Sequence, residues 1–67
     1  MEGKYEFLVE IVYEDGSGFN FNVTIEGREG SVLAELSMIT RGTLRASSGH
    51  RATAYNKDGI DVVSYVR

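Results

Sequence analysis

The chain contains no cysteine and only one histidine among its 67 residues. Without cysteine it can form neither a disulfide nor a zinc finger, and a single histidine cannot supply a typical histidine-based metal site. We therefore expect no metal and no cofactor. Because a chain this short buries only about 60% of the surface that its unfolded form exposes, its stability has to come from good packing or from self-association. A homodimer is one of the states that we expect.

The sequence also lacks a long apolar segment. No run approaches the roughly 20 residues of a membrane-spanning helix. Near the N-terminus, Glu6, Glu10 and Glu14 interrupt the apolar stretch that a signal peptide needs. With 42% hydrophobic and 25% charged residues, the composition is that of one globular domain covering residues 1–67. We expect a cytoplasmic protein with no membrane partner.

The charges are unevenly distributed along the chain, whose formal net charge is −3. Residues 1–35 contain eight acids and two bases, a net charge of −6, whereas residues 36–67 contain five bases and two acids, a net charge of +3. Such an asymmetry can mark an interaction surface. In a folded domain the two halves interleave, so neutralisation across a sheet explains the same asymmetry.

Alternation of apolar and polar residues predicts a first β-hairpin. Residues 4–14 and 19–26 both have the period of two that is typical of a half-buried strand, and glycines in the segment 15–18 supply the turn between them. The apolar faces of the two strands consist of Tyr5, Phe7, Val9, Ile11 and Tyr13, and of Phe19, Phe21, Val23 and Ile25.

From Val32 onward the apolar residues recur at helical spacing. Ser31 is the predicted N-cap, because its hydroxyl can accept a hydrogen bond from a free amide of the first turn. Gly42 leaves two alternatives, since glycine costs about 1 kcal/mol relative to alanine inside a helix. It ends the helix near residue 41, or it lies against the sheet and the helix continues to the segment 47–49. The apolar stripe consists of Val32, Leu33, Leu36 and Ile39, with Leu44 added if the helix continues.

A second hairpin is predicted from residues 50–56 and 60–67, which flank the turn Asn56–Gly59. The turn has the composition of a type I turn followed by a left-handed glycine. In the register that follows from it, Ala54 opposes Val62 and Ala52 opposes Ser64. One face then consists of Ala52, Ala54, Ile60, Val62 and Val66. The other consists of Arg51, Thr53, Tyr55, Asp61, Val63 and Tyr65.

Together these elements predict an α+β fold of the order ββαββ. Four mainly antiparallel strands form one sheet, and one helix packs on one of its faces. The small side chains of Ala52 and Ala54 leave room for the helix to lie close to the sheet. The order of the strands does not follow from the sequence.

The sequence offers little material for catalysis. A serine triad would require His50, and no serine stands in the G-x-S-x-G pattern of a nucleophile elbow. The glycine-containing turns match neither a phosphate-binding loop nor a dinucleotide fingerprint. We therefore expect no catalytic residues and a protein that is not an enzyme. A small enzyme subunit remains as a third hypothesis.

The predicted sheet face opposite the helix is the first candidate site. Its apolar and aromatic residues are more numerous than a solvated face requires, and a contiguous patch of this kind marks an interface. Two interpretations remain open: the face is exposed to solvent, or it binds another protein or a second copy of the chain. Under the second, the chain is a protein-interaction or accessory module acting through the open sheet face or an edge strand. The candidate interaction face consists of Leu8, Val12, Arg51, Tyr55, Val63 and Tyr65.

The segment TRGTLRASSGHR, residues 40–51, is the second candidate site. It concentrates basic residues in an acidic chain, which favours a weak nucleic-acid or anion-binding module as the alternative function. The isoelectric point of about 4.9 argues against nucleic acid as the partner. Basic residues are also what the end of a helix prefers, so the segment has a structural explanation. The candidate anion contacts are Arg41, Arg45, His50 and Arg51.

Overall fold

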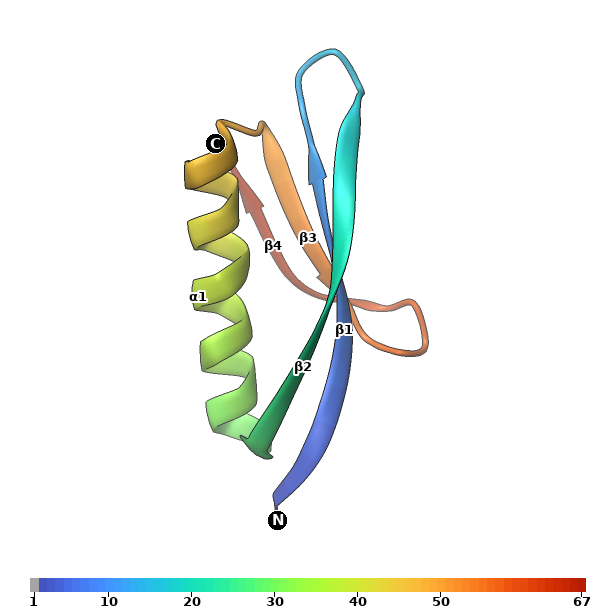
Figure 1. Cartoon of the computed structure of the whole chain (residues 1–67), viewed down its shortest axis with the longest axis vertical. Coiled ribbons are helices and arrows are strands. Elements are labelled where there is room, and N and C mark those ends of the chain that lie inside the picture. Colours follow the sequence, from blue (N-terminus) through green and yellow to red (C-terminus); the bar gives the residue numbers. More distant parts are fainter. Residues whose placement is uncertain (1) are drawn as a thin grey trace.

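The computed structural model describes residues 2–67, which form one antiparallel sheet and one helix (Figure 1). The elements are β1 (Glu2–Val12), β2 (Gly18–Arg28), α1 (Glu29–Ser47), β3 (Arg51–Tyr55) and β4 (Asp61–Val66). The four strands lie in the order β2-β1-β3-β4, and α1 packs on one face of the sheet. This is the predicted α+β fold with the order ββαββ.

The two hairpin turns have the same backbone geometry. In the first, the amide of Gly16 donates to the carbonyl of Tyr13 over 3.0 Å, and in the second the amide of Gly59 donates to the carbonyl of Asn56 over the same distance. Gly16 and Gly59 have φ angles of 90° and 78°, the left-handed conformation that glycine adopts without steric cost. The turn predicted at Asn56–Gly59 is thereby confirmed. The first turn begins at Tyr13, one residue after β1 ends.

The helix begins two residues before the predicted cap. β2 continues to Arg28, which is the N-cap of α1 and makes no capping hydrogen bond through its side chain. Gly27 has a φ of 150°, so the chain can turn from strand to helix without a loop. Ser31 therefore lies within the first turn of α1, where it is exposed, and its predicted capping role is wrong.

Gly42 neither ends the helix nor lies against the sheet. It is exposed on the solvent side of α1, and no atom beyond the helix lies within 4 Å of the position that a Cβ would take. The helix ends at Ser47, followed by Ser48 in the left-handed conformation with a φ of 59°. The helix thus continues past Gly42 to the segment 47–49, as the second alternative predicted, but the predicted position of Gly42 against the sheet is wrong.

The buried stripe of α1 differs in three positions from the predicted one: Thr40 is added, Leu33 is absent, and Ile39 is only half-buried. The stripe consists of Val32, Leu36, Thr40 and Leu44, spaced by four residues. Thr40 is fully buried because its hydroxyl donates to the carbonyl of Leu36 over 2.7 Å, so no polar atom is left unpaired. Leu33, predicted in the stripe, is 39% exposed. No helix of the described residues is long and apolar enough to span a membrane.

The core lies between α1 and the face of the sheet formed by alternate residues of β1. Val9 opposes Ala54 and Ile11 opposes Ala52 across the β1–β3 ladder, and all four are completely buried. The small alanines permit the close approach of helix and sheet that the sequence predicted. The buried hydrophobic residues are Phe7, Val9, Ile11, Ile25, Val32, Leu36, Leu44, Ala52 and Ala54.

The register of the second hairpin corrects the predicted faces. Tyr55 opposes Asp61 but Ala54 opposes Val63, so the ladder is irregular here and Val62 is an extra residue on β4. A bulge of this kind shifts every later residue of its strand by one position and so to the opposite face. Val63 and Tyr65 consequently pack against the core beneath α1, not on the open face where the sequence placed them.

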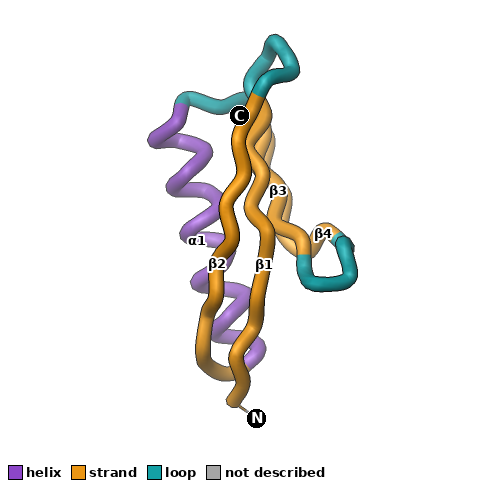
Figure 2. Tube along the Cα trace, turned by 45° about the vertical axis from the view of Figure 1, so that its right-hand side comes forward, coloured by secondary structure: helices purple, strands orange, loops and turns teal. Residues whose placement is uncertain are grey.

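The first hairpin extends well beyond the second. β1 and β2 have 11 residues each, whereas β3 has five and β4 has six. β3 covers only residues 8–12 of β1, so the molecule is elongated, with extents of 41 × 20 × 14 Å. Figure 2 shows the β1–β2 turn at one end and the β3–β4 turn projecting sideways near the middle of the molecule.

Candidate functional site

The open face of the sheet is mainly polar. From β2 it receives Asn20, Asn22 and Thr24, which stand opposite Glu10, Leu8 and Glu6 of β1. Of the predicted interaction face, the structure brings together Leu8 with Tyr55 and Val12 with Arg51 as directly opposed pairs. It separates them from Val63 and Tyr65, which lie on the other face. Without those two residues, the apolar patch predicted here shrinks to a few half-buried side chains.

The outer edge of β2 is the longest unpaired edge of the sheet. β2 has β1 on one side and no strand on the other over its 11 residues, Gly18–Arg28. The β1–β2 register runs without a bulge, and the stretch from Gly18 to Ile25 contains neither a proline nor a charged residue. Bulges, prolines and charges are the features by which edge strands usually prevent pairing with other chains. Most of this edge lacks all three.

The free hydrogen-bonding groups of this edge belong to alternate residues. The amide of Tyr13 donates to the carbonyl of Ser17 over 2.7 Å. Counting from this bond shows which opposed pairs of β1 and β2 are hydrogen-bonded to each other. In an antiparallel ladder, bonded and non-bonded pairs alternate. The residues of β2 whose amides and carbonyls point away from β1 are therefore Asn20, Asn22 and Thr24. Their polar side chains lie on the open face, whereas the apolar side chains between them lie on the helix side.

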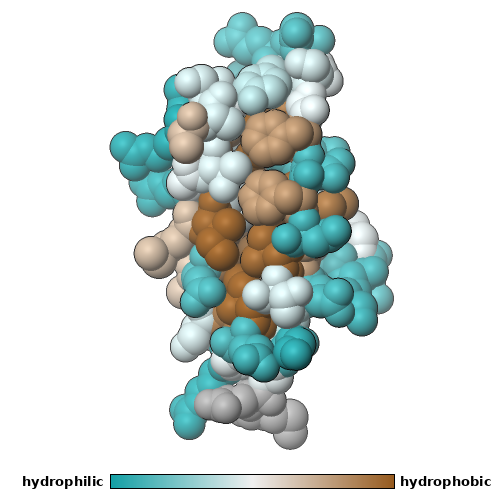
Figure 3. Space-filling view, in the orientation of Figure 1, coloured by the Kyte–Doolittle hydropathy of each residue, from teal (hydrophilic) through white to brown (hydrophobic). Residues whose placement is uncertain are grey.

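A band of apolar side chains borders this edge on the helix side. Phe19 is 40% exposed and stacks on Phe21, with ring centroids 6.4 Å apart, while Tyr13 lies 6.3 Å from Phe19 on the other side. Ile39 and Val23, both half-buried, pack nearby against the core. Figure 3 shows this band of hydrophobic side chains between α1 and β2. The edge of β2 therefore combines free backbone groups with an adjacent aromatic surface.

The other free edges of the sheet are less suited to pairing with an added strand. The outer edge of β4 is six residues long, Asp61–Val66. The part of β1 not covered by β3 lies beside the β3–β4 turn, where the ammonium of Lys57 is 3.7 Å from the carboxylate of Glu6. A short edge and a charged side chain beside an edge both hinder strand addition.

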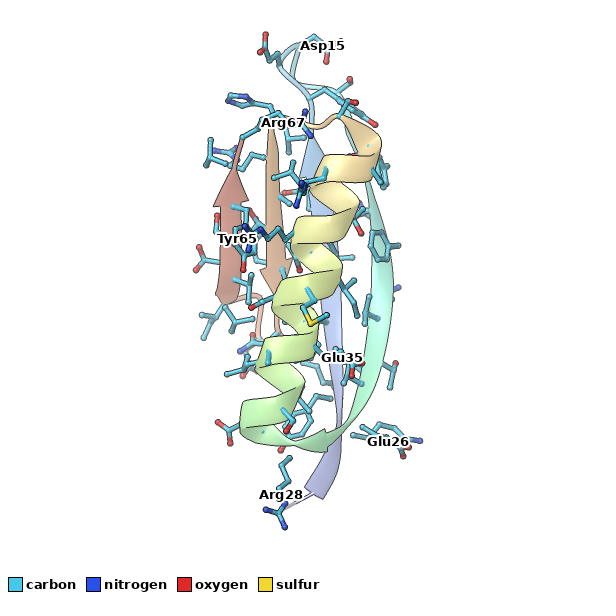
Figure 4. All side chains as sticks on the ribbon, turned by 90° about the vertical axis from the view of Figure 1, so that its left-hand side faces the viewer. Asp15, Glu26, Arg28, Glu35, Tyr65 and Arg67 are labelled. Carbon is cyan, nitrogen blue, oxygen red and sulfur yellow. The ribbon has the colours of Figure 1, made fainter. Side chains whose placement is uncertain are left out.

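A second surface feature is a basic cleft between the last turns of α1 and β4. Its volume is about 820 Å³, and its walls consist of Arg41, Leu44, Arg45, Tyr65, Val66 and Arg67. The guanidinium carbon of Arg41 lies 6.0 Å from the centre of the Tyr65 ring, and Nη2 of Arg67 donates to the carbonyls of Leu44 and Arg45. Figure 4 shows Tyr65 and Arg67 beside the C-terminal half of α1, far from Glu26 and Arg28 at the opposite end.

The structure divides the four predicted anion contacts. Arg41 and Arg45 stand one helical turn apart and line the cleft. Arg51 opposes Val12 and therefore lies on the open face of the sheet, and exposed His50 lies in the connection between α1 and β3; neither lines the cleft. Arg67, which sequence reasoning missed, takes their place because its amide bonds to the carbonyl of His50 across the hairpin over 2.8 Å.

The titratable groups do not indicate an acid–base site. The hydroxyl of Ser17 donates to the carboxylate of Asp15 over 2.6 Å, and together with the Ser17 amide it lowers the pKa of this carboxyl group. Asp15 lies in the exposed first turn, and the shift reflects the hydrogen bonds of the turn itself. Within the described residues, no three histidine, aspartate or glutamate side chains are grouped so that they could hold a metal ion.

Comparison with known proteins gives no further assignment: no family model, no curated protein and no solved structure matches the chain.

Proposed function

We propose that this chain is a non-enzymatic protein-interaction module that assembles with a second copy by pairing the two β2 edges. The observation that carries the proposal is the free edge of β2, which is uncharged from Gly18 to Ile25 and lies beside the exposed ring of Phe19. Strand addition to such an edge uses backbone hydrogen bonds for affinity and alternate side chains for specificity.

The sequence of β2 is complementary to itself in an antiparallel arrangement. With Asn22 opposite its counterpart, Asn20 opposes Thr24 and Phe21 opposes Val23. Polar residues then meet polar residues on one face, and apolar residues meet apolar residues on the other. Glu26 opposes Gly18 in this register, so no two like charges face each other.

The resulting assembly is one continuous eight-stranded sheet with both helices on the same face. A two-fold axis perpendicular to the sheet makes the interface isologous, the commonest arrangement among homodimers. The apolar bands that contain Phe19 and Phe21 meet at the seam between the two helices, which buries the aromatic surface left exposed in one chain. A small domain gains the additional core that it cannot build alone.

Light scattering during size-exclusion chromatography tests the assembly. At high concentration we expect a mass twice the 7.4 kDa of one chain. The variant Asn22→Pro removes an amide that points away from β1, so it should leave the β1–β2 ladder intact but abolish dimerisation. The matched control Asn22→Thr keeps the amide and a side chain suited to strands, and it should remain dimeric. A monomeric wild type would refute the proposal.

A crosslinking experiment tests the register. Because the chain has no cysteine, Asn22→Cys introduces a single thiol. Directly opposed residues of a hydrogen-bonded pair have Cα atoms about 5.5 Å apart, which a disulfide can span. We expect rapid oxidation to a covalent dimer. The control Ser64→Cys places a thiol at an exposed position of β4 and should remain reduced. Equal crosslinking of both variants would contradict pairing through β2.

A further inference from the structure

The arginines of the basic cleft have no acidic partners. The two ion pairs formed by residues 3–67 are Lys4–Glu26 and Lys57–Glu6, and both use lysines. Arg41, Arg45 and Arg67 thus bring three positive charges to one cleft with no carboxylate of residues 3–67 within 4.0 Å. The end of a helix favours such cations, and because no carboxylate neutralises them, the same three charges remain available to an anionic ligand.

Local contacts hold two of these side chains in place. Arg41 lies over the ring of Tyr65, and cation–π contacts of this kind order a guanidinium without neutralising it. Nη2 of Arg67 donates to the carbonyls of Leu44 and Arg45 over 3.4 and 3.3 Å. These bonds offset the negative end of the helix dipole, which otherwise disfavours an anion at this end of α1. The cleft is therefore arranged for an anion although it lies at a helix C-terminus.

We propose that this cleft binds a small ligand that bears two adjacent phosphates. The guanidinium group matches the geometry of phosphate oxygens and binds them with two parallel hydrogen bonds. Three such groups suit two adjacent phosphates better than a single carboxylate. The cleft is open to solvent, so the three guanidinium groups are accessible to a ligand that approaches from outside.

This site is separate from the proposed dimer interface. The cleft is formed by α1 and β4, whereas the interface is formed by β2 at the opposite edge of the sheet. Loss of one activity therefore leaves the other measurable.

NMR titration of the isotopically labelled full chain tests the proposal. The probes are ADP, inorganic pyrophosphate and adenosine, each added at roughly 20 mM salt, where charges are weakly screened. We expect ADP and pyrophosphate to shift the amide signals of residues 41–45 and 65–67, and adenosine to shift none. If ADP binds more tightly than pyrophosphate, the nucleoside also contacts the protein; equal affinity assigns the binding to the phosphates alone. Both results support the site.

The variants Arg41→Gln and Arg45→Gln should each weaken ADP binding by about tenfold, the effect of removing one charge-assisted hydrogen bond. Arg51→Gln is the matched control, since it removes the same charge on the open face and should leave the affinity unchanged. The proposal is overturned if neither phosphate ligand shifts these signals, if Arg51→Gln weakens binding as much, or if only a single-stranded oligonucleotide binds.

Discussion

The two hairpins of this protein share one turn geometry and differ in almost everything else. Both turns close with a glycine at positive φ, yet β1 and β2 run for 11 residues each while β3 and β4 stop after five and six. The longer hairpin provides an outer edge that is uncharged from Gly18 to Ile25 and a neighbouring band of aromatic side chains. The shorter one provides a short edge that ends in a cleft of arginines.

The difference shows that the turn determines how a hairpin closes but not what its outer strand can bind. Length and side-chain pattern decide that. β2 keeps its register with β1 throughout, so its apolar residues remain on one side and its free backbone groups form a regular row. β4 contains a bulge at Val62, which moves Tyr65 to the helix side and so completes the cleft with Arg41.

The largest difference between the hairpins should appear in stability. Ile25 of β2 is 3% exposed and lies in the core, so Ile25→Ala should lower the free energy of unfolding by about 2–5 kcal/mol. Val66 of β4 is 66% exposed, and Val66→Ala should change the free energy of unfolding by less than about 0.5 kcal/mol. Urea unfolding followed by circular dichroism measures both values, at a concentration where the oligomeric state is the same. Equal decreases in the free energy of unfolding for the two variants would contradict the view that β2 contributes to the core while the end of β4 does not.

The shared turn geometry predicts a smaller and equal effect. Gly16→Ala and Gly59→Ala each force a Cβ into the left-handed conformation, at a cost of about 1–2 kcal/mol. No other atom lies within 4 Å of either position, so steric contacts add nothing. Thermal unfolding should show similar decreases in Tm for the two variants. A large difference between them would show that the turns are less alike than their hydrogen bonds indicate.

The smallest expected effect is on the pKa of Asp15, whose carboxylate accepts a side-chain hydrogen bond that has no counterpart in the second turn. Ser17→Ala removes the hydroxyl that donates to Asp15, so the pKa of Asp15 should rise toward its ordinary value of 3.8. Because the pKa is lowered in the folded state, the stabilisation by Asp15 is present above pH 3.8 and is lost as the pH falls through the folded value. NMR titration of the Asp15 carboxyl carbon measures the shift. An unchanged pKa would show that the amide bond alone lowers it.

Much of the fold could be predicted because the patterns are local. The alternation in residues 4–14 and 19–26 identified the first hairpin, and the composition of Asn56–Gly59 identified the second turn. The stop at Ser47–Gly49 was also visible. The helix cap was not, since Gly27 allows the helix to begin directly after β2 and leaves Ser31 inside the first turn.

The candidate sites were less predictable because they depend on distant residues. One bulged residue, Val62, removed Val63 and Tyr65 from the predicted interaction face. Arg67 lies 22 residues beyond Arg45 in the chain and reaches its carbonyl only because β4 ends beside the helix C-terminus. The exposed edge of β2 required the strand order, which the sequence does not specify.

By itself, the sequence determined the types of element, their order, and the faces of the first hairpin, because hydrophobic period and turn composition act over a few residues. Tertiary structure alone decided which strand is the edge, which face of β4 meets the helix, and which arginines share a cleft. Those outcomes depend on how the whole chain packs around Val9, Ile11 and Leu36. Both proposed activities, pairing through β2 and phosphate binding between α1 and β4, depend on this packing.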